Sequence, residues 1–119
     1  KHNYYIHAWL NVSNKGECIE WHAHNRSTKE SGFVGVLYVD NTSQFGTDHR
    51  LLDKQGNTLY THNVQPGDGY FMMYREVAGV QHRTYPVTTD QPRITIAMFV
   101  APEEKIDEPY KFNNYWIPL

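Results

Sequence analysis

The stretch HRTYPVTTDQPRITIAMF, residues 82–99, decides the fold that we expect for this chain. It begins with His82, passes through a turn at Pro86-Val87-Thr88, and ends in a segment that opens with Arg93 and alternates between apolar and other residues. Alternation over several residues is typical of a β-strand with one buried face. The sequence therefore predicts a strand over residues 93–100 that carries one arginine and follows a strand that carries a histidine.

The same period-two pattern, rich in β-branched and aromatic residues, recurs along the whole chain. It predicts about eight short strands, and no long helical pattern interrupts them. The expected strands cover residues 4–12, 17–24, 33–40, 46–53, 58–64, 70–74, 79–87 and 93–100. Many short strands at regular spacing favour an all-β sandwich or jelly roll over alternating strands and helices. We expect one domain over residues 1–119, in which 102–119 form a C-terminal tail that packs on the barrel.

Composition excludes several classes of function. The chain has 119 residues and a net charge of −2, so it lacks the basic excess with which proteins bind nucleic acids or anionic membranes. Its single cysteine, Cys18, excludes an intrachain disulfide. No apolar run reaches the roughly 18 residues of a membrane span and no signal peptide is visible, so we expect a cytoplasmic protein.

Histidines suggest a metal site. The chain contains 7 of them, and His22 and His24 are separated by one residue. On a strand, both imidazoles would lie on one face, about 7 Å apart along the backbone. His82 is the candidate third ligand, and three ligands on one face leave open positions of the kind that non-heme iron enzymes use. The alternative is a solvent-facing set of histidines, because the neighbouring Cys18 and Glu20 are mixed in character.

Three further residues suggest a carboxylate-binding site. Arg93 and Thr95 point to the same side of the predicted strand, and a guanidinium beside a hydroxyl suits a carboxylate. Tyr38, in the predicted strand 33–40, could reach the same carboxylate through its hydroxyl. The alternatives are that Arg93 pairs with Asp90 at the rim and that Tyr38 satisfies its hydroxyl elsewhere.

Taken in order, these residues resemble the 2-oxoglutarate- and Fe(II)-dependent dioxygenase superfamily, in particular its prolyl-4-hydroxylase-like and phage-encoded branches. His22-Ala23-His24 stands where the family has its His-x-Asp metal motif, and His82 stands where it has its distal histidine. Pro86-Val87-Thr88 and Arg93-Ile94-Thr95 follow as they do in the family. Tyr38-Val39-Asp40 is similar to a strand end whose tyrosine helps to bind the co-substrate.

The resemblance covers roughly residues 16–100 and implies a cupin-like jelly roll, the double-stranded β-helix. It implies an oxygenase that uses Fe(II) and 2-oxoglutarate to hydroxylate a peptide side chain or a small molecule. The implied iron ligands are His22, His24 and His82. The implied co-substrate residues are Arg93, Thr95 and Tyr38.

Residue 24 departs from the family pattern, because the family has a carboxylate ligand at this position. Three alternatives explain this departure. In the first, the site has three histidines, and the dianionic co-substrate balances the charge of the metal. In the second, a carboxylate from Glu20, Glu30 or Asp48 completes the site, and in the third, the protein has lost catalysis and kept the fold.

A second resemblance is to the cupins, because Gly16 and His22-x-His24 match the motif G-x5-H-x-H. Cupins place a glutamate three or four residues further on, whereas Glu30 comes after five residues. A cupin-like metal or small-molecule binder without turnover is therefore an alternative, and a structural jelly roll with incidental histidines is another. The loops 25–31 and 75–81 are expected to face the substrate. The brevity of the chain before its first strand suggests a minimal enzyme, a fragment, or a homo-oligomer that completes the site.

Overall fold

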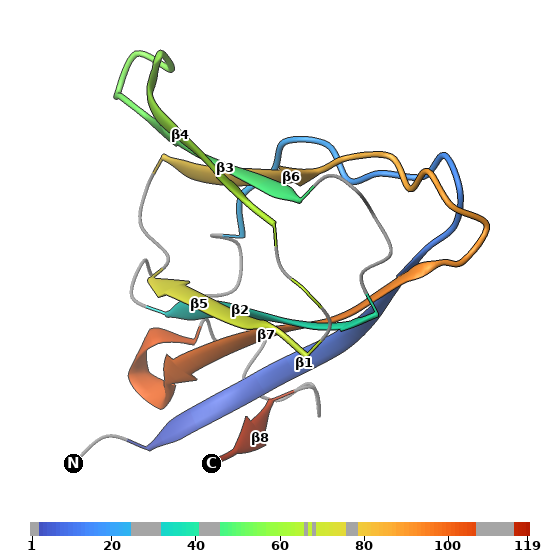
Figure 1. The fold of residues 1–119 in the computed structure, drawn as a ribbon. Coiled ribbons are helices and arrows are strands. Elements are labelled where there is room, and N and C mark those ends of the chain that lie inside the picture. The colour runs from blue at the N-terminus through green and yellow to red at the C-terminus, as the bar shows by residue number, and fades with distance from the viewer. Residues whose placement is uncertain are drawn as a thin grey trace.

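Strands in two facing layers make up the part of the chain that the computed structural model describes, which is residues 3–24, 32–40, 46–65, 67, 69–75, 79–106 and 116–119 (Figure 1). The larger sheet consists of β5 (Phe71–Arg75), β2 (Phe33–Asp40), β7 (Arg93–Pro102), β1 (Tyr4–Ser13) and β8 (Ile117–Pro118), in that order. The smaller sheet consists of β4 (Thr58–Val64), β3 (Thr47–Leu52) and β6 (Val80–Thr84). All pairings between these strands are antiparallel, which confirms the predicted all-β fold.

β7 is the central strand of the larger sheet. It lies between β2 and β1, and its pairing with β1 runs without interruption from Ser13 opposite Arg93 to Tyr4 opposite Pro102. Alternate residues of β7 are buried, beginning with Arg93 and Thr95. Further along the same face, Phe99 joins the core. One face of a single strand therefore supplies both polar residues and core residues.

The hydrophobic core is small and lies at one end of this inner face. Its buried members are Val34, Phe99, Ala101, Ile106 and Trp116. They come from β2, β7 and the segments that follow β7, and Tyr5, Trp9 and Tyr74 pack against them. This core joins the two ends of the chain, because β8 immediately follows Trp116 and pairs with the edge of β1.

The outward face of the larger sheet is apolar and exposed. Leu10 and Val12 are 61% and 50% exposed, and they alternate with residues that point inward. Phe71 and Met73 of β5 are also exposed on this face. Among the described residues, no helix has the length and apolar character that a membrane crossing requires.

The prediction of a strand over residues 17–24 is wrong. The segment forms one isolated bridge, His22 with His82, and a second isolated bridge joins Lys15, just before it, to Val87. It runs beside β6, where His22 exchanges two backbone hydrogen bonds of 3.0 Å with His82 and the Thr84 N–H donates to the Ile19 carbonyl. The distance from Ile19 to His22 is three residues, whereas the distance between their partners Thr84 and His82 on β6 is two. The segment therefore has one extra residue, as in a β-bulge, and its side chains do not alternate regularly between two faces.

The other expected strands are present within a few residues of their predicted bounds. Directly after β7, residues Glu103–Lys105 form a 3-10 turn. Of the two loops expected to face a substrate, 25–31 lies outside the described residues. The other, 75–81, is described only in part, and its Gln81 belongs to β6.

Candidate functional site

A cavity of about 140 Å³ lies between the two sheets. β1, β2 and β7 line it from the larger sheet, and β3, β6 and the segment around His22 line it from the other side. Its volume is close to the roughly 150 Å³ that holds a benzene molecule in an engineered protein cavity, so it suits a small molecule. Two polar groups share this lining, one of imidazoles and one built around an arginine.

His22, His24 and His82 form the imidazole group. One ring nitrogen from each residue lies within 4.8 Å of the other two. His24 Nε2 and His82 Nε2 are 3.1 Å apart, and the ring centroids are separated by 4.1 to 4.7 Å. The structure thus brings together all three histidines that the sequence singled out, although His22 and His24 do not lie on a strand.

Hydrogen bonds orient two of these imidazoles. His22 Nδ1 lies 2.7 Å from the carbonyl oxygen of Glu20, so Nδ1 carries a proton and donates it to this oxygen. His82 Nδ1 lies 2.9 Å from the hydroxyl of Tyr74, which leaves His82 Nε2 directed at His24. Partners of this kind orient histidine ligands in metal sites.

Burial keeps two of the three histidines neutral. It lowers the pKa of His82 to about 2, with a further contribution from the neighbouring histidines. Burial, together with His22, lowers the pKa of His24 to about 4. Metal ions bind neutral imidazole, so at neutral pH these two side chains are in the state that ligation requires.

Arg93 is the centre of the second polar group. Its side chain is buried, with the residue only 4% exposed. Its Nη2 donates to Thr84 Oγ1 at 2.8 Å and to Ser13 Oγ at 3.3 Å, and its Nη1 donates to the Tyr85 carbonyl at 3.4 Å. All these acceptors are uncharged, and no carboxylate among the described residues forms an ion pair with this guanidinium.

The alternative partner for Arg93 does not reach it. Asp90 pairs with Lys15 at 2.8 Å, and both side chains are largely exposed. A buried cation without a counter-ion is unfavourable, because it loses its hydration and gains no opposite charge in return. Burial accordingly lowers the pKa of Arg93. The cavity therefore contains a positive charge that an anionic ligand would neutralise.

Hydroxyl groups surround this charge. Tyr38 and Thr95 both line the cavity and stand opposite each other in the pairing of β2 with β7. The Tyr38 hydroxyl lies 2.7 Å from Thr47 Oγ1. Ser13 and Thr84 also line the cavity and bind Arg93 directly. The structure thus places Tyr38 and Thr95 in one cavity with Arg93.

Sequence reasoning missed Ser13, Thr47 and Thr84. A signal was present for Ser13, because Trp9, Asn11 and Ser13 share one face of β1 and two of them are polar. The contribution of Thr47 depends on the pairing of β3 with β6, where it stands opposite Thr84.

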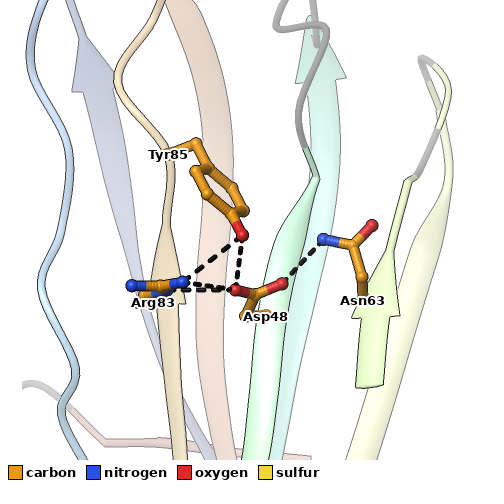
Figure 2. Close-up of polar contacts among 4 residues, drawn as sticks. All are labelled: Asp48, Asn63, Arg83 and Tyr85. Atoms are coloured by element: carbon orange, nitrogen blue, oxygen red, sulfur yellow. Dashed lines mark hydrogen bonds and ion pairs between the residues drawn. The ribbon is translucent and has the colours of Figure 1, made fainter. Parts of the chain in front are cut away.

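Two of the carboxylates considered as a metal ligand, Asp48 and Glu20, lie outside the histidine cluster. Asp48 accepts hydrogen bonds from Arg83 at 2.9 Å, from Tyr85 at 2.7 Å and from Asn63 at 2.8 Å, as Figure 2 shows. Burial alone raises the pKa of Asp48, but these hydrogen bonds outweigh it and hold the pKa below its usual value. Glu20 contacts Cys18 and is not part of the histidine cluster. Glu30 lies outside the described residues.

The solved structures similar to this chain include a prolyl-4-hydroxylase, a member of the 2OG-Fe(II) oxygenase family and a non-heme monooxygenase. An oxidoreductase of the 2OG-Fe(II) oxygenase family from Burkholderia pseudomallei aligns with a TM-score of 0.65 and 18% identity, over 85% of this chain and 46% of that one. A prolyl-4-hydroxylase from Pseudomonas putida aligns with a TM-score of 0.56 and 18% identity, over 79% and 50%. The nickel complex of the non-heme monooxygenase ThoJ aligns with a TM-score of 0.60 and 13% identity, over 85% and 45%.

These similarities confirm the predicted jelly-roll fold. At this level of identity they concern the fold alone, and the chain spans about half the length of the structures that it matches. No protein-family model and no curated protein matches the sequence.

Proposed function

We propose that this chain is the core of an Fe(II)- and 2-oxoglutarate-dependent oxygenase. The observation that carries the proposal is that three clustered imidazoles and a buried arginine, with no counter-ion among the described residues, line one small cavity. The fold shared with 2OG-Fe(II) oxygenases supports it. Within that superfamily, the motifs around His82 and Arg93 favour the prolyl-4-hydroxylase-like and phage-encoded branches.

The donor atoms fit a transition metal. Imidazole nitrogen binds iron, zinc, copper and nickel, whereas magnesium and calcium prefer oxygen ligands. His22, His24 and His82 would hold the metal through the nitrogens that face one another. We name iron because the similar solved structures include 2OG-Fe(II) oxygenases. When bound, the iron would supply the activation of O₂.

The second polar group fits the far carboxylate of 2-oxoglutarate. Arg93 would bind this carboxylate, with the hydroxyls of Thr95 and Tyr38 beside it. The keto-acid end of the same molecule would then face the histidines. Trp9, Val34 and Val36 also line the cavity and would exclude water from it.

The reaction that we propose is hydroxylation of a peptide side chain or a small molecule. One O₂ and one 2-oxoglutarate are consumed, one oxygen atom enters the substrate as hydroxyl, and the other enters succinate as CO₂ is released. The cytoplasmic location that we expect from the sequence belongs to the same proposal.

A cupin-like metal binder without turnover is the alternative. It is favoured by one observation, namely that no carboxylate of the described residues joins the histidine cluster. Such a protein would bind the metal and show no dependence on 2-oxoglutarate.

An anaerobic titration tests the proposal. Fe(II) is added first and 2-oxoglutarate second, and the weak visible charge-transfer band of the chelate is recorded. We expect the band in the wild type. Arg93→Gln should raise the 2-oxoglutarate concentration needed for the band by roughly 10- to 100-fold, because charge-assisted hydrogen bonds are lost.

Arg50→Gln is the matched control, because Arg50 bonds to Gln81 and lies against Trp21, away from the cavity lining. It should leave the titration unchanged. Bound iron without any band would remove the oxygenase and leave the cupin-like binder. Absence of iron binding would remove both.

A further inference from the structure

The outward face of the larger sheet lies on the side of β1, β2 and β7 that is turned away from the cavity. We propose that this face is the contact surface of a homodimer, in which two copies of the chain pack their larger sheets together about a two-fold axis. The proposal concerns assembly, and it does not depend on the reaction proposed above.

The residues of this face are almost all apolar. Across its middle, one row of neighbouring strands carries Leu10, Ile96, Leu37 and Phe71. Only two of the outward residues in the five strands are charged, and each lies at an end of the face. An antiparallel sheet with one face in water normally alternates apolar residues with polar ones. The composition of this face therefore indicates a sheet that is covered on both sides.

The exposed area of the face matches one side of a stable dimer. Leu10, Val12, Phe71, Met73 and Ile117 are each between 45% and 61% exposed. With about 150–200 Å² for each whole residue, they and the less exposed residues between them offer roughly 800 Å² of apolar surface. The largest apolar patch on a typical monomer is about 300–600 Å², whereas each partner of a standard interface buries about 800 Å².

Gly35 keeps the centre of the face flat. A Cβ atom at this position would lie 2.9 Å from Met98 Cγ and 3.2 Å from the ring of Phe71. Because glycine has no Cβ, both side chains can lie close to its backbone. Flat sheets pack face to face about 10 Å apart, as in a β-sandwich. When the same surface is used on both copies, a two-fold axis closes the assembly as a dimer.

The two charged residues define the direction of the axis. Arg75 stands opposite Phe33, where β2 begins, and Asp40 ends β2 and stands opposite Ile94. A two-fold axis that runs across the strands exchanges the two ends of the sheet. It therefore places Arg75 of each copy at the end where the other copy has Asp40. Opposite charges then meet twice, and like charges are kept apart.

Sedimentation equilibrium of the full chain at about 1 to 100 µM tests the proposal. EDTA is present, so that a metal ion shared between histidines does not join two copies. We expect twice the chain mass of 14.0 kDa. The Kd of the dimer should lie below about 1 µM, because interfaces of this size range from micromolar to picomolar affinity.

Two variants place a charge within the face. Leu10→Glu and Met73→Lys should each raise the Kd of the dimer by at least about 100-fold, because the charge loses its hydration in an apolar contact. Leu59→Glu is the matched control, since Leu59 is 63% exposed and lies on β4 of the smaller sheet. It should leave the Kd within about 3-fold of the wild type. Circular dichroism checks that each variant is folded.

Charge reversal tests the direction of the axis. Arg75→Glu and Asp40→Arg should each weaken the homodimer by at least about 10-fold, because like charges then meet at both ends of the contact. An equimolar mixture of the two variants should form a heterodimer with a Kd within about 3-fold of the wild type, since each reversed charge meets its opposite. A mixture that stays as weak as the separate variants would overturn the proposed axis.

Three results would overturn the homodimer itself. The first is a monomer of 14.0 kDa at about 100 µM, which would show that two copies do not cover the face. The second is a dimer that both Leu10→Glu and Met73→Lys leave intact, which would place the contact on another surface. The third is a mixture of aggregates without a defined size. A monomer that binds Fe(II) and 2-oxoglutarate would leave the oxygenase standing.

Discussion

Tyr74 determines how His82 presents its ring to the cavity. Its hydroxyl contacts His82 Nδ1 at 2.9 Å, and the other ring nitrogen of His82 lies 3.1 Å from His24 Nε2. Loss of an outer partner of this kind weakens metal binding by about 10- to 100-fold in other metal sites. Tyr74→Phe should therefore weaken Fe(II) binding in the presence of 2-oxoglutarate by such a factor, as measured by equilibrium dialysis.

Tyr60→Phe is the control for this prediction, because Tyr60 is exposed on β4 and its hydroxyl lies near His62 rather than near the cavity. An affinity for Fe(II) that is equal in Tyr74→Phe and the wild type would show that the backbone bonds between His22 and His82 suffice to orient the ring.

Among the elements, the segment over residues 17–24 shows how much of the site could be predicted from the sequence. The spacing of His22 and His24 predicted that both would face one side, and both do line the cavity. The strand invoked to explain this is absent, because an extra residue between Ile19 and His22 interrupts the pairing with β6. Local periodicity carries no information about such an insertion.

Pairing between strands is the other part that the sequence did not reveal. β7 was predicted with its alternation, and Arg93 and Thr95 accordingly line the cavity. Ser13 reaches Arg93 because it stands opposite it in β1, and Thr47 stands opposite Thr84 for the same reason. These contacts join residues far apart in the chain, so they follow from the fold and not from any local motif.

Asp48 holds the three strands of the smaller sheet together. It lies on β3 and bonds to Asn63 of β4 and Arg83 of β6 (Figure 2). Asp48→Asn should lower the free energy of unfolding by about 1.5–3 kcal/mol, because hydrogen bonds to a buried charged group are lost. Urea denaturation measures the change. The control is Asp90→Asn, whose side chain is 93% exposed, and a comparable loss there would contradict the role given to Asp48.

For the whole molecule, buried histidines make stability depend on pH. His24 and His82 have pKa values of about 4 and about 2 in the folded chain, whereas an unfolded histidine titrates near 6.5. Between these values the unfolded chain binds more protons, so the free energy of unfolding falls as the pH is lowered. Burial also lowers the pKa of His7 and His49, which act in the same direction.

Thermal unfolding of the metal-free protein at pH 7.5, 6.5, 5.5 and 4.5 measures this dependence, with the largest losses expected below about pH 6.5. His82→Asn should reduce the slope, since one low-pKa group is removed. A melting temperature that is constant from pH 6.5 to 4.5 would show that these imidazoles are not buried as the structure places them.

β7 also ties ligand binding to correct folding. Its inward residues include the guanidinium of the cavity and the phenylalanine of the core, and they share one alternating face. A slip of one position against β1 would exchange the two faces of the strand. Ile94 and Ile96 would then enter the cavity, while Arg93 and Phe99 would turn outward together. Molecules misaligned in this way would lose the core contacts of Phe99 and the anion-binding side chain of Arg93 together. Only molecules with the native alignment of β7 would therefore bind a dicarboxylate.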